Sequence, residues 1–311
     1  MVSENPVVDT PTPSSFPDLH AFLSADEVPA GLIEIQHQGL PIEVLNVPAD
    51  SDTTLVCFHG AAEKDVRLPW FLGQGVTAGL PVNRIFISDP SLRKSTDLNL
   101  AWYAGSNEQP DLQETLADVV RRIVRATGGY NVVFFGSSGG GYAALALSRF
   151  FPTSLALAVN PQTSISRFYP GAVERYMTYA WEMDGKDMSE LPASVAHNLI
   201  PAYSAGFSHT VALIQNAKDW FHIQKHQLPF VDVVGDSDNL FMLMDRWGPD
   251  TGDGHIPPPK ELIRACFEEL AKCRGDWRAG LTASGFQAET TRQDVKRRVL
   301  DTAPAKAASD T

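Results

Sequence analysis

Short, uninterrupted runs of hydrophobic residues alternate along the chain with amphipathic stretches. The runs predict buried strands at residues 53–58, 84–88, 131–135, 155–159, 210–215 and 240–244. Hydrophobic residues at helical spacing predict helices at residues 111–127, 140–150 and 260–273. Fully apolar strands that alternate with helices are typical of an α/β fold, in which a mostly parallel sheet is covered by helices on both faces.

Two segments depart from this alternation. Residues 31–47 form two strand-like runs around the turn Gly39-Leu40-Pro41, which predicts an antiparallel hairpin at one edge of the sheet. Residues 167–207 are rich in Tyr, Trp and Met and are too long for a plain loop, so we expect a helical cap over the sheet. Its aromatic side chains would either form an apolar wall above a site or attach the cap to the sheet.

The two ends of the chain differ from its middle in composition. Residues 1–17 are rich in Pro, Ser, Thr and Asp, and residues 301–311 are small and polar. Such segments bury too little apolar surface to offset their ordering entropy, so both are predicted to be flexible tails. Residues 18–300 then form one large domain, which a chain of 311 residues allows.

Charge and composition exclude several classes of function. The chain has 25 Lys and Arg against 37 Asp and Glu, a formal charge of −12, which argues against a nucleic-acid partner or an anionic membrane surface. Three cysteines do not make a disulfide framework. No apolar run is long enough to span a membrane, and the first residues lack the pattern of a signal peptide, so we expect a cytoplasmic location.

The most informative motif is Gly136-Ser137-Ser138-Gly139-Gly140, which matches G-x-S-x-G with Ser138 at its centre. It follows a predicted strand and opens a predicted helix, the context in which a nucleophilic serine sits on a sharp turn between small neighbours. The Gly139 amide would then point toward a developing oxyanion. The alternative is a Gly- and Ser-rich turn without chemistry, although neither G-x-x-x-x-G-K-[ST] nor G-x-G-x-x-G is present.

On this motif and its context, the chain resembles the α/β-hydrolase superfamily of serine esterases and acyl hydrolases over about residues 31–273. The resemblance implies a triad in the order serine, acid, histidine, with the acid after a late strand and the histidine after the last one. It also implies an oxyanion loop after the third strand and often a cap inserted after the sixth.

His255 fits the catalytic base, because it lies in a loop between the last predicted strand and the last helix, flanked by Gly254 and prolines. The alternative is a solvated loop histidine. Asp219 follows the strand at residues 210–215 directly and would accept the His255 N–H. Asn160 occupies an earlier position where some superfamily members carry the acid, and it cannot serve as one. The competing acids are Asp236, Asp238, Asp245, Asp250 and Asp253.

The predicted oxyanion loop is His59-Gly60-Ala61-Ala62, which departs from the H-G-G-G form. Ala61 would give the second oxyanion amide beside Gly139, with Ala62 as the fallback. We interpret His59 as a buried structural residue that holds the loop.

Three aromatic residues are predicted to contact the substrate: Trp102 and Tyr103, which follow the fourth strand, and Tyr176 in the cap. His222 and His226 are four residues apart, as two metal ligands on a helix would be, but Ile223 stands where H-E-x-x-H has Glu. Their nearness to Asp219 suggests a supporting role, and a polar helix face is the favoured interpretation. No metal or other cofactor is expected.

These residues together predict a serine hydrolase that cleaves a small-molecule carboxylic ester through an acyl-serine intermediate on Ser138, Asp219 and His255. An acyltransferase, for example one that transfers an O-acetyl group to a glycan, would use the same triad. The segments 134–143, 160–163 and 254–258 are similar to those of bacterial superfamily members associated with glycan and glycoprotein biosynthesis. A non-catalytic binding protein on the same fold is the alternative of a different class, and the sequence does not indicate the oligomeric state.

Overall fold

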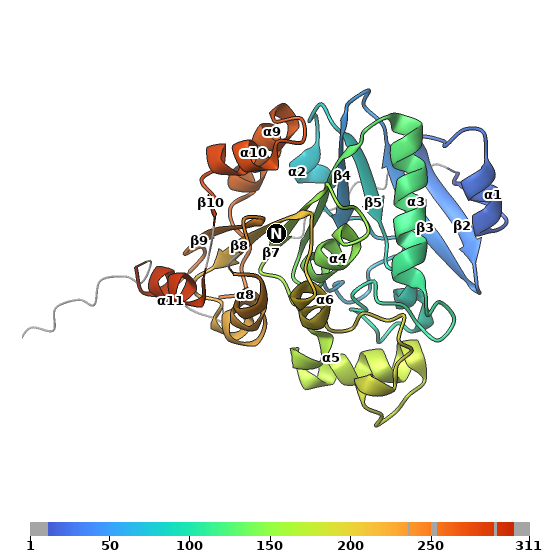
Figure 1. Ribbon diagram of the computed structural model, residues 1–311. Coiled ribbons are helices and arrows are strands. Elements are labelled where there is room, and N and C mark those ends of the chain that lie inside the picture. The colour runs from blue at the N-terminus through green and yellow to red at the C-terminus, as the bar shows by residue number, and fades with distance from the viewer. Residues whose placement is uncertain (1–11, 236, 250–253, 289–290, 302–311) are drawn as a thin grey trace, which may run out of the picture.

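The computed structural model describes residues 12–235, 237–249, 254–288 and 291–301. Within these residues a ten-stranded sheet has the order β1-β2-β3-β5-β4-β6-β7-β8-β9-β10 (Figure 1). The strands are β1 (Ser14–Phe16), β2 (Gly31–His37), β3 (Leu40–Val47), β4 (Thr53–Phe58), β5 (Asn83–Ile87), β6 (Asn131–Ser137), β7 (Leu155–Val159), β8 (Thr210–Asn216), β9 (Leu240–Asp245) and β10 (Gln287–Ala288).

The centre of the sheet is parallel, from β5 through β4, β6, β7 and β8 to β9. These six strands lie where the apolar runs predicted them, since strands buried on both faces have few polar positions. The predicted hairpin is also present, because β2 and β3 pair antiparallel and β3 joins the parallel strands through β5. The prediction of a mostly parallel sheet with an antiparallel hairpin is confirmed.

Two edge strands were not predicted. Residues 14–16 form β1, which pairs parallel with β2, and the Phe16 ring packs against Phe22 at a centroid distance of 5.2 Å. The predicted tail at residues 1–17 is therefore wrong for these three residues. At the other edge β10 pairs antiparallel with β9. Residues 1–11 and 302–311, which carry the rest of the predicted tails, lie outside the described residues.

Helices cover both faces of the sheet (Figure 1). One apolar cluster includes side chains of α3, α4 and α8, and a second includes side chains of α9 and α10. All ten residues of α4 are buried. The helices outside the cap are α1 (Leu19–Ser24), α2 (Gln74–Thr77), η1 (Pro90–Lys94), α3 (Leu112–Thr127), α4 (Gly139–Ser148), α7 (Trp220–His222), η5 (Ile223–Gln227), α8 (Leu228–Val234), α9 (Lys260–Lys272), α10 (Trp277–Ala283) and α11 (Arg292–Asp301).

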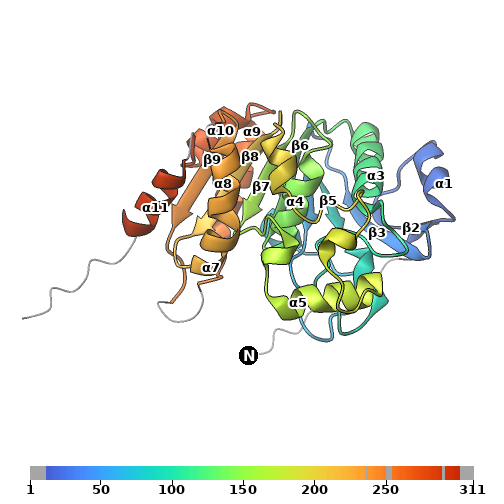
Figure 2. The same ribbon diagram turned by 60° about the horizontal axis from the view of Figure 1, so that its bottom comes forward.

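The predicted cap consists of short helices rather than long ones. They are η2 (Ile165–Arg167), α5 (Pro170–Arg175), η3 (Tyr176–Ala180), η4 (Met188–Glu190) and α6 (Ile200–Ser204). Figures 1 and 2 show α5 at one end of the molecule. Tyr176, Met177 and Trp181 are buried in the main apolar cluster, so these side chains attach the cap to the domain.

Among the described residues, no helix is both long and apolar enough to cross a membrane.

Candidate active site

Ser138 occupies the turn between β6 and α4 with φ 58° and ψ −118°. A positive φ is unfavourable for a residue with a Cβ, so the surrounding contacts must hold it. The Ser138 N–H donates to the Val159 carbonyl at 2.9 Å, and the Ser138 carbonyl accepts from the Tyr142 N–H at 3.1 Å. The side chain is half-buried, so the hydroxyl lies on a rigid turn at the edge of the sheet.

The two glycines of the motif are required by space. A Cβ at Gly136 would lie 2.2 Å from the Gly140 carbonyl oxygen, and a Cβ at Gly140 would lie 2.6 Å from the Phe58 oxygen. Neither contact is possible for a carbon atom without moving backbone. Both glycines of G-x-S-x-G are therefore required, because the turn, the start of α4 and the end of β4 approach too closely for a larger residue at either position.

Asp219 follows β8 and contacts two histidines. Its Oδ2 lies 2.6 Å from His255 Nδ1 and its Oδ1 lies 2.8 Å from His222 Nδ1. Oδ1 also accepts from the His222 backbone N–H at 3.2 Å, which caps α7. Burial would raise the pKa of Asp219, but the hydrogen bonds from His222 and His255 outweigh it and hold this pKa at about 2. The carboxylate is charged at neutral pH.

The loop that carries His255 is held against Asp219 by its backbone. Gly254 has φ +75°, and a Cβ there would lie 2.3 Å from the Lys218 carbonyl. The Ile256 carbonyl accepts from both Asn160 Nδ2 and Asn216 Nδ2, each at 3.1 Å. Asn160, which could not be the acid, thus helps to position the loop. The His255 side chain is 27% exposed, against 1% for His222.

The competing acids lie elsewhere or outside the described residues. Asp245 is exposed at the end of β9, where its carboxylate accepts from the Arg246 N–H, and Asp238 is exposed as well. Asp236, Asp250 and Asp253 lie outside the described residues. Of the acids that are described, Asp219 is the one in contact with His255.

The predicted oxyanion loop, residues 59–62, lies directly against the Ser138 turn. A Cβ at Gly60 would be 3.0 Å from the Ser137 carbonyl oxygen. The Ala62 N–H donates to the Asn99 carbonyl at 2.7 Å, so the fallback amide is already used. Ala61 is exposed, and Gly139 begins α4, where first-turn amides have no partner within the helix. The roles of the Ala61 and Gly139 amides stay predictions.

His59 is buried, as predicted, and holds the loop. Its Nε2 accepts from the Asp89 N–H at 3.1 Å, so the ring proton is on Nδ1 and is donated to the Gly60 carbonyl at 2.8 Å. Burial lowers the pKa of His59 to about 4, although the Gly60 hydrogen bond acts in the opposite direction. A neutral, doubly bonded imidazole is a structural support for the turn.

Gln162, just after β7, was not singled out as a functional residue. Its Nε2 lies 2.8 Å from Ser138 Oγ and 3.2 Å from His222 Nε2, and its Oε1 accepts from Trp102 Nε1 at 2.7 Å. The side chain is completely buried. Its position after a parallel strand was the available signal, because side chains that follow neighbouring strands converge at one edge of the sheet.

The three aromatic residues predicted to contact substrate are all buried. Trp102 donates to Gln162, and the Tyr103 hydroxyl accepts from the His59 N–H and donates to the Ile87 carbonyl, both at 2.9 Å. The Tyr176 hydroxyl donates to the Gly105 carbonyl at 3.1 Å. In the structure these side chains support the loops of the site, and direct substrate contact stays a prediction.

The interpretation of His222 and His226 as a polar helix face is wrong, because their exposed fractions are 1% and 0%. The potential ligand atoms of Asp219, His222 and His255 lie within 4.8 Å of one another, so this cluster could in principle hold a metal ion. The two Nδ1–carboxylate distances of 2.6 and 2.8 Å are those of hydrogen bonds. A metal ion needs each ligand at about 2.0–2.2 Å and does not fit between such a pair.

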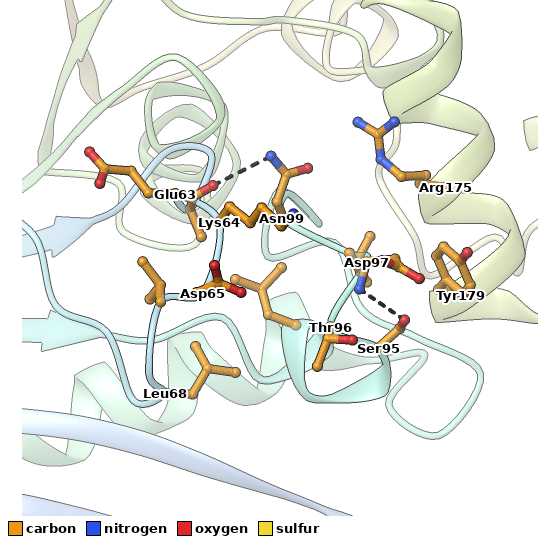
Figure 3. A pocket seen from close by; sticks show the side chains of 14 residues that line it. Glu63, Lys64, Asp65, Leu68, Ser95, Thr96, Asp97, Asn99, Arg175 and Tyr179 are labelled. Carbon is orange, nitrogen blue, oxygen red and sulfur yellow. Dashed lines mark hydrogen bonds between the residues drawn. The ribbon is translucent and has the colours of Figure 1, made fainter.

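A cavity of about 700 Å³ lies beside the predicted oxyanion loop (Figure 3). Its buried floor includes Ala62, Leu92 and Leu98, and Ser138 itself does not line it. Figure 3 shows Arg175 across the cavity from the loop that carries Lys64. The charged lining residues are Glu63, Lys64, Asp65, Asp97 and Arg175. An apolar floor with a charged rim suits a ligand that is apolar in one part and polar in another.

The parallel strand order, the Ser138 turn and the flanking helices define the α/β-hydrolase fold. Among solved structures, the chain is similar to the capsule O-acetyltransferase of Neisseria meningitidis serogroup A, at 14% identity, TM-score 0.57, over 80% of this chain and 98% of that one. It is also similar to the acylaminoacyl peptidase of Pyrococcus horikoshii, at 10% identity, TM-score 0.53, over 81% of this chain and 43% of that one.

The acetyl xylan esterase of Paenibacillus sp. R4 is a third similar structure, at 15% identity, TM-score 0.50, over 82% of this chain and 92% of that one. At these identities the comparisons establish the fold, which confirms the predicted fold class. No protein-family model matches the sequence, and no curated protein matches it at the sequence level.

Proposed function

We propose that the protein is a serine hydrolase that cleaves a small-molecule carboxylic ester through an acyl-Ser138 intermediate. The observation that carries the proposal is that the ends of neighbouring parallel strands bear both Ser138, on a positive-φ turn after β6, and the Asp219–His255 contact of 2.6 Å, after β8 and β9. A constrained serine and a carboxylate-bound histidine at the same edge of a sheet are the parts of a nucleophilic acyl-transfer site.

In this mechanism His255 takes the Ser138 proton while Oγ forms a bond to the ester carbonyl carbon. The tetrahedral intermediate collapses, the bond from carbonyl carbon to alcohol oxygen breaks, and His255 returns the proton to the leaving alcohol. His255 then takes a proton from water, whose oxygen attacks the acyl-Ser138 carbon. The acid leaves and Ser138 regains its proton. Asp219 stabilises the imidazolium formed in each half-reaction, because its carboxylate is charged and bonded to Nδ1.

The charge that develops on the carbonyl oxygen would be stabilised by the N–H groups of Gly139 and Ala61. This part of the proposal is supported by the close approach of the Gly60 loop to the Ser138 turn and by the use of the Ala62 N–H elsewhere. Backbone donors that are fixed before the reaction stabilise an oxyanion without reorganising.

Two surfaces beside the site suit the two parts of an ester. The cavity next to Ala62 has an apolar floor and a charged rim, and we assign one end of the substrate to it. The second surface begins at Phe168, which lies edge-on to Trp102 at a centroid distance of 5.8 Å and is 5.9 Å from the His222 ring. Tyr169 and Phe221 stack at 4.3 Å next to it and extend this apolar wall.

A second candidate is O-acyl transfer by the same residues. It is favoured by the likeness to the capsule O-acetyltransferase, which extends over 98% of that chain, and by a charged cavity large enough for an acceptor alcohol. In this reaction an alcohol oxygen, deprotonated by His255, attacks acyl-Ser138 in place of water. The alcohol becomes the new ester and Ser138 is restored.

The test of the proposed function is covalent labelling by a fluorophosphonate, with mass spectrometry to locate the adduct. We expect an adduct on Ser138 that is lost in Ser138→Ala and forms far more slowly in His255→Ala. Ser137→Ala is the matched control and should label like the wild type. A folded wild-type protein that is not labelled would overturn the serine mechanism and favour the binding-protein alternative.

The same preparations separate hydrolysis from transfer. Esters from acetyl to octanoyl are offered with and without sugar alcohols, and the products are quantified. Free acid as the main product supports the hydrolase, whereas acylated sugar that forms at the expense of free acid supports the transferase.

A further inference from the structure

Gln162 connects the nucleophile to the second histidine of the site. Its Nε2 is 2.8 Å from Ser138 Oγ and 3.2 Å from His222 Nε2, and His222 Nδ1 is 2.8 Å from Asp219 Oδ1. Asp219 Oδ2 accepts from His255. Ser138 and His255 are therefore linked by a buried chain of contacts through Gln162, His222 and Asp219.

Trp102 fixes the orientation of the Gln162 amide. An indole nitrogen can only donate, so the atom of Gln162 that lies 2.7 Å from Trp102 Nε1 must be the carbonyl oxygen Oε1. The NH2 group then faces Ser138 and His222. A flipped amide would set its NH2 against the Trp102 N–H, and both groups are completely buried, so no water can replace the lost partner.

The fixed amide constrains the proton of Ser138. Because Gln162 Nε2 can only donate, Ser138 Oγ accepts this hydrogen bond and does not use its own proton in it. The hydroxyl proton is directed elsewhere. In the proposed mechanism that proton is the one taken by the base.

The same amide constrains the protonation of His222. Its Nε2 must accept from Gln162, so this nitrogen carries no proton and the ring proton is on Nδ1, bonded to Asp219. A protonated His222 would set an Nε2–H against the Gln162 NH2 at 3.2 Å. His222 is thus a neutral donor to one oxygen of Asp219.

We propose that Gln162 is a positioning residue that keeps His222 neutral, leaves His255 as the proton-accepting histidine of the pair, and turns the Ser138 hydroxyl proton toward that base. This inference rests on the proposed function for its catalytic consequence. The assignment of the His222 tautomer rests on the contacts alone.

Other groups around His222 act on its protonation in both directions. The Asp219 carboxylate favours a charged ring, whereas a charged His255, stacked at 4.0 Å with an interplanar angle of 12°, opposes it. His226 lies 5.4 Å away on the following helical turn. The rings of Phe168 from the cap and Phe221 from α7 also lie near His222, at 5.9 and 5.3 Å. Among these contacts, the one with Gln162 requires an unprotonated Nε2.

The first test is nitrogen NMR of the full chain labelled with ¹⁵N-histidine, from neutral pH down to the acid limit of the fold. We expect His222 to remain neutral with its proton on Nδ1 over this range. In Gln162→Glu, which presents acceptors of the same shape, His222 should become doubly protonated at a higher pH. Protonation of His222 in the folded wild type at the same pH as in Gln162→Glu would overturn the proposal.

The second test measures the rate of fluorophosphonate labelling and its pH profile. Gln162→Met, which keeps the length but removes the donor, should label about 100-fold more slowly and with a shifted profile, as expected when a reacting group loses its positioning contact. Trp102→Phe frees the amide to flip and should give a smaller loss. An unchanged profile in Gln162→Met, with its fold verified by near-UV circular dichroism, would contradict the proposal.

The two tests separate this inference from the proposed function. Absence of labelling in the wild type would refute the serine mechanism, while the NMR titration would still report whether Gln162 sets the state of His222. Normal labelling combined with a charged His222 would refute the inference and leave the function standing.

Discussion

At the scale of single residues, Asp219 is the centre of the site, because each of its carboxylate oxygens accepts from a different histidine. Its buried charge is held by His255 Nδ1 at 2.6 Å and by His222 Nδ1 at 2.8 Å. The His255 side chain is 27% exposed and His222 is covered, so only one of the two rings is open to a reacting group. In the proposed mechanism the carboxylate therefore orients His255 for proton transfer, and His222 supports the carboxylate.

The substitution Asp219→Asn keeps the size and shape of the side chain but prevents it from accepting hydrogen bonds from both His222 and His255. The amide can accept from one imidazole but sets its NH2 group against the other, which forces a wrong tautomer or breaks a bond. We expect kcat/KM for ester hydrolysis to fall by about 10³–10⁴-fold, as for removal of a triad carboxylate charge.

The matched control is Asp245→Asn, at an exposed position at the end of β9. It should behave like the wild type in ester turnover. Wild-type turnover in Asp219→Asn would contradict the role of this carboxylate.

At the scale of elements, the site is built by the ends of β6, β7, β8 and β9 and the residues that follow them. The apolar runs were sufficient to predict these strands, because each is buried on both faces. Ser138, Asp219 and His255 could be selected from sequence because each follows a strand in the order that the superfamily resemblance implies. The contacts of Gln162 and His222 could not be predicted in the same way, since they join side chains from three different strand ends. The sequence indicated only that each lies close to a predicted strand end or to Asp219.

The short elements were the least predictable. The strands β1 and β10 have three and two residues, too few for a hydrophobic period to be recognised. The cap was predicted as helical, but its division into short helices follows from packing of Tyr176 and Trp181 into the domain.

The turn between β6 and α4 gives a prediction at this scale. In Gly140→Ala the new Cβ would lie 2.6 Å from the Phe58 oxygen and within 3 Å of His59 backbone, so strands and turn must shift. We expect a loss of about 2–4 kcal/mol in the free energy of unfolding, in the range of severe core substitutions, measured by urea denaturation.

Gly75→Ala is the control, because Gly75 lies in α2 and a Cβ there meets nothing within 4 Å. It should leave stability unchanged or raise it by up to about 1 kcal/mol, from helix propensity. Equal stability of the two variants would show that the close approach at Gly140 is not required.

At the scale of the whole molecule, several buried groups have altered pKa values that couple folding to pH. Burial lowers the pKa of His59 and His209 to about 4 and that of His226 to about 3. Burial also lowers the pKa values of His37 and His197. In the opposite direction, burial raises the pKa of Asp89 to about 6. These histidines therefore bind protons more readily in the unfolded chain than in the folded protein. Asp89 binds a proton more readily in the folded protein.

The predicted consequence is a loss of stability on acidification. The count uses His59, His209 and His226, whose pKa values decrease most. Between their unfolded pKa near 6.5 and their folded pKa of about 3–4, the unfolded chain binds about three more protons at these histidines than the folded chain does. Between its folded pKa of about 6 and its ordinary pKa, Asp89 is protonated in the folded protein but not in the unfolded chain, so it reduces this difference by about one proton. The net uptake of about two protons makes the free energy of unfolding fall by about 2–3 kcal/mol per pH unit around pH 5.

Urea unfolding at a series of pH values from 7 to 5 would measure this slope. The Tyr203 hydroxyl lies 2.9 Å from His209 Nε2, and in His209→Gln the new amide can still be its partner. This variant removes one of the titrating histidines, so the slope should decrease by about 1.4 kcal/mol per pH unit, the equivalent of one proton. Stability that is constant or rises as the pH falls over this range would contradict the assignment of neutral, buried histidines.

The most direct test of the central claim is to trap the covalent intermediate during turnover. The wild-type protein is mixed with an activated acetyl ester, quenched in acid before the steady state, and digested for mass spectrometry. The account predicts one acetyl group on the peptide that contains Ser138, a matching burst of released alcohol, and neither in Ser138→Ala. Turnover that persists in Ser138→Ala, or that proceeds with no acyl group on Ser138, would contradict it.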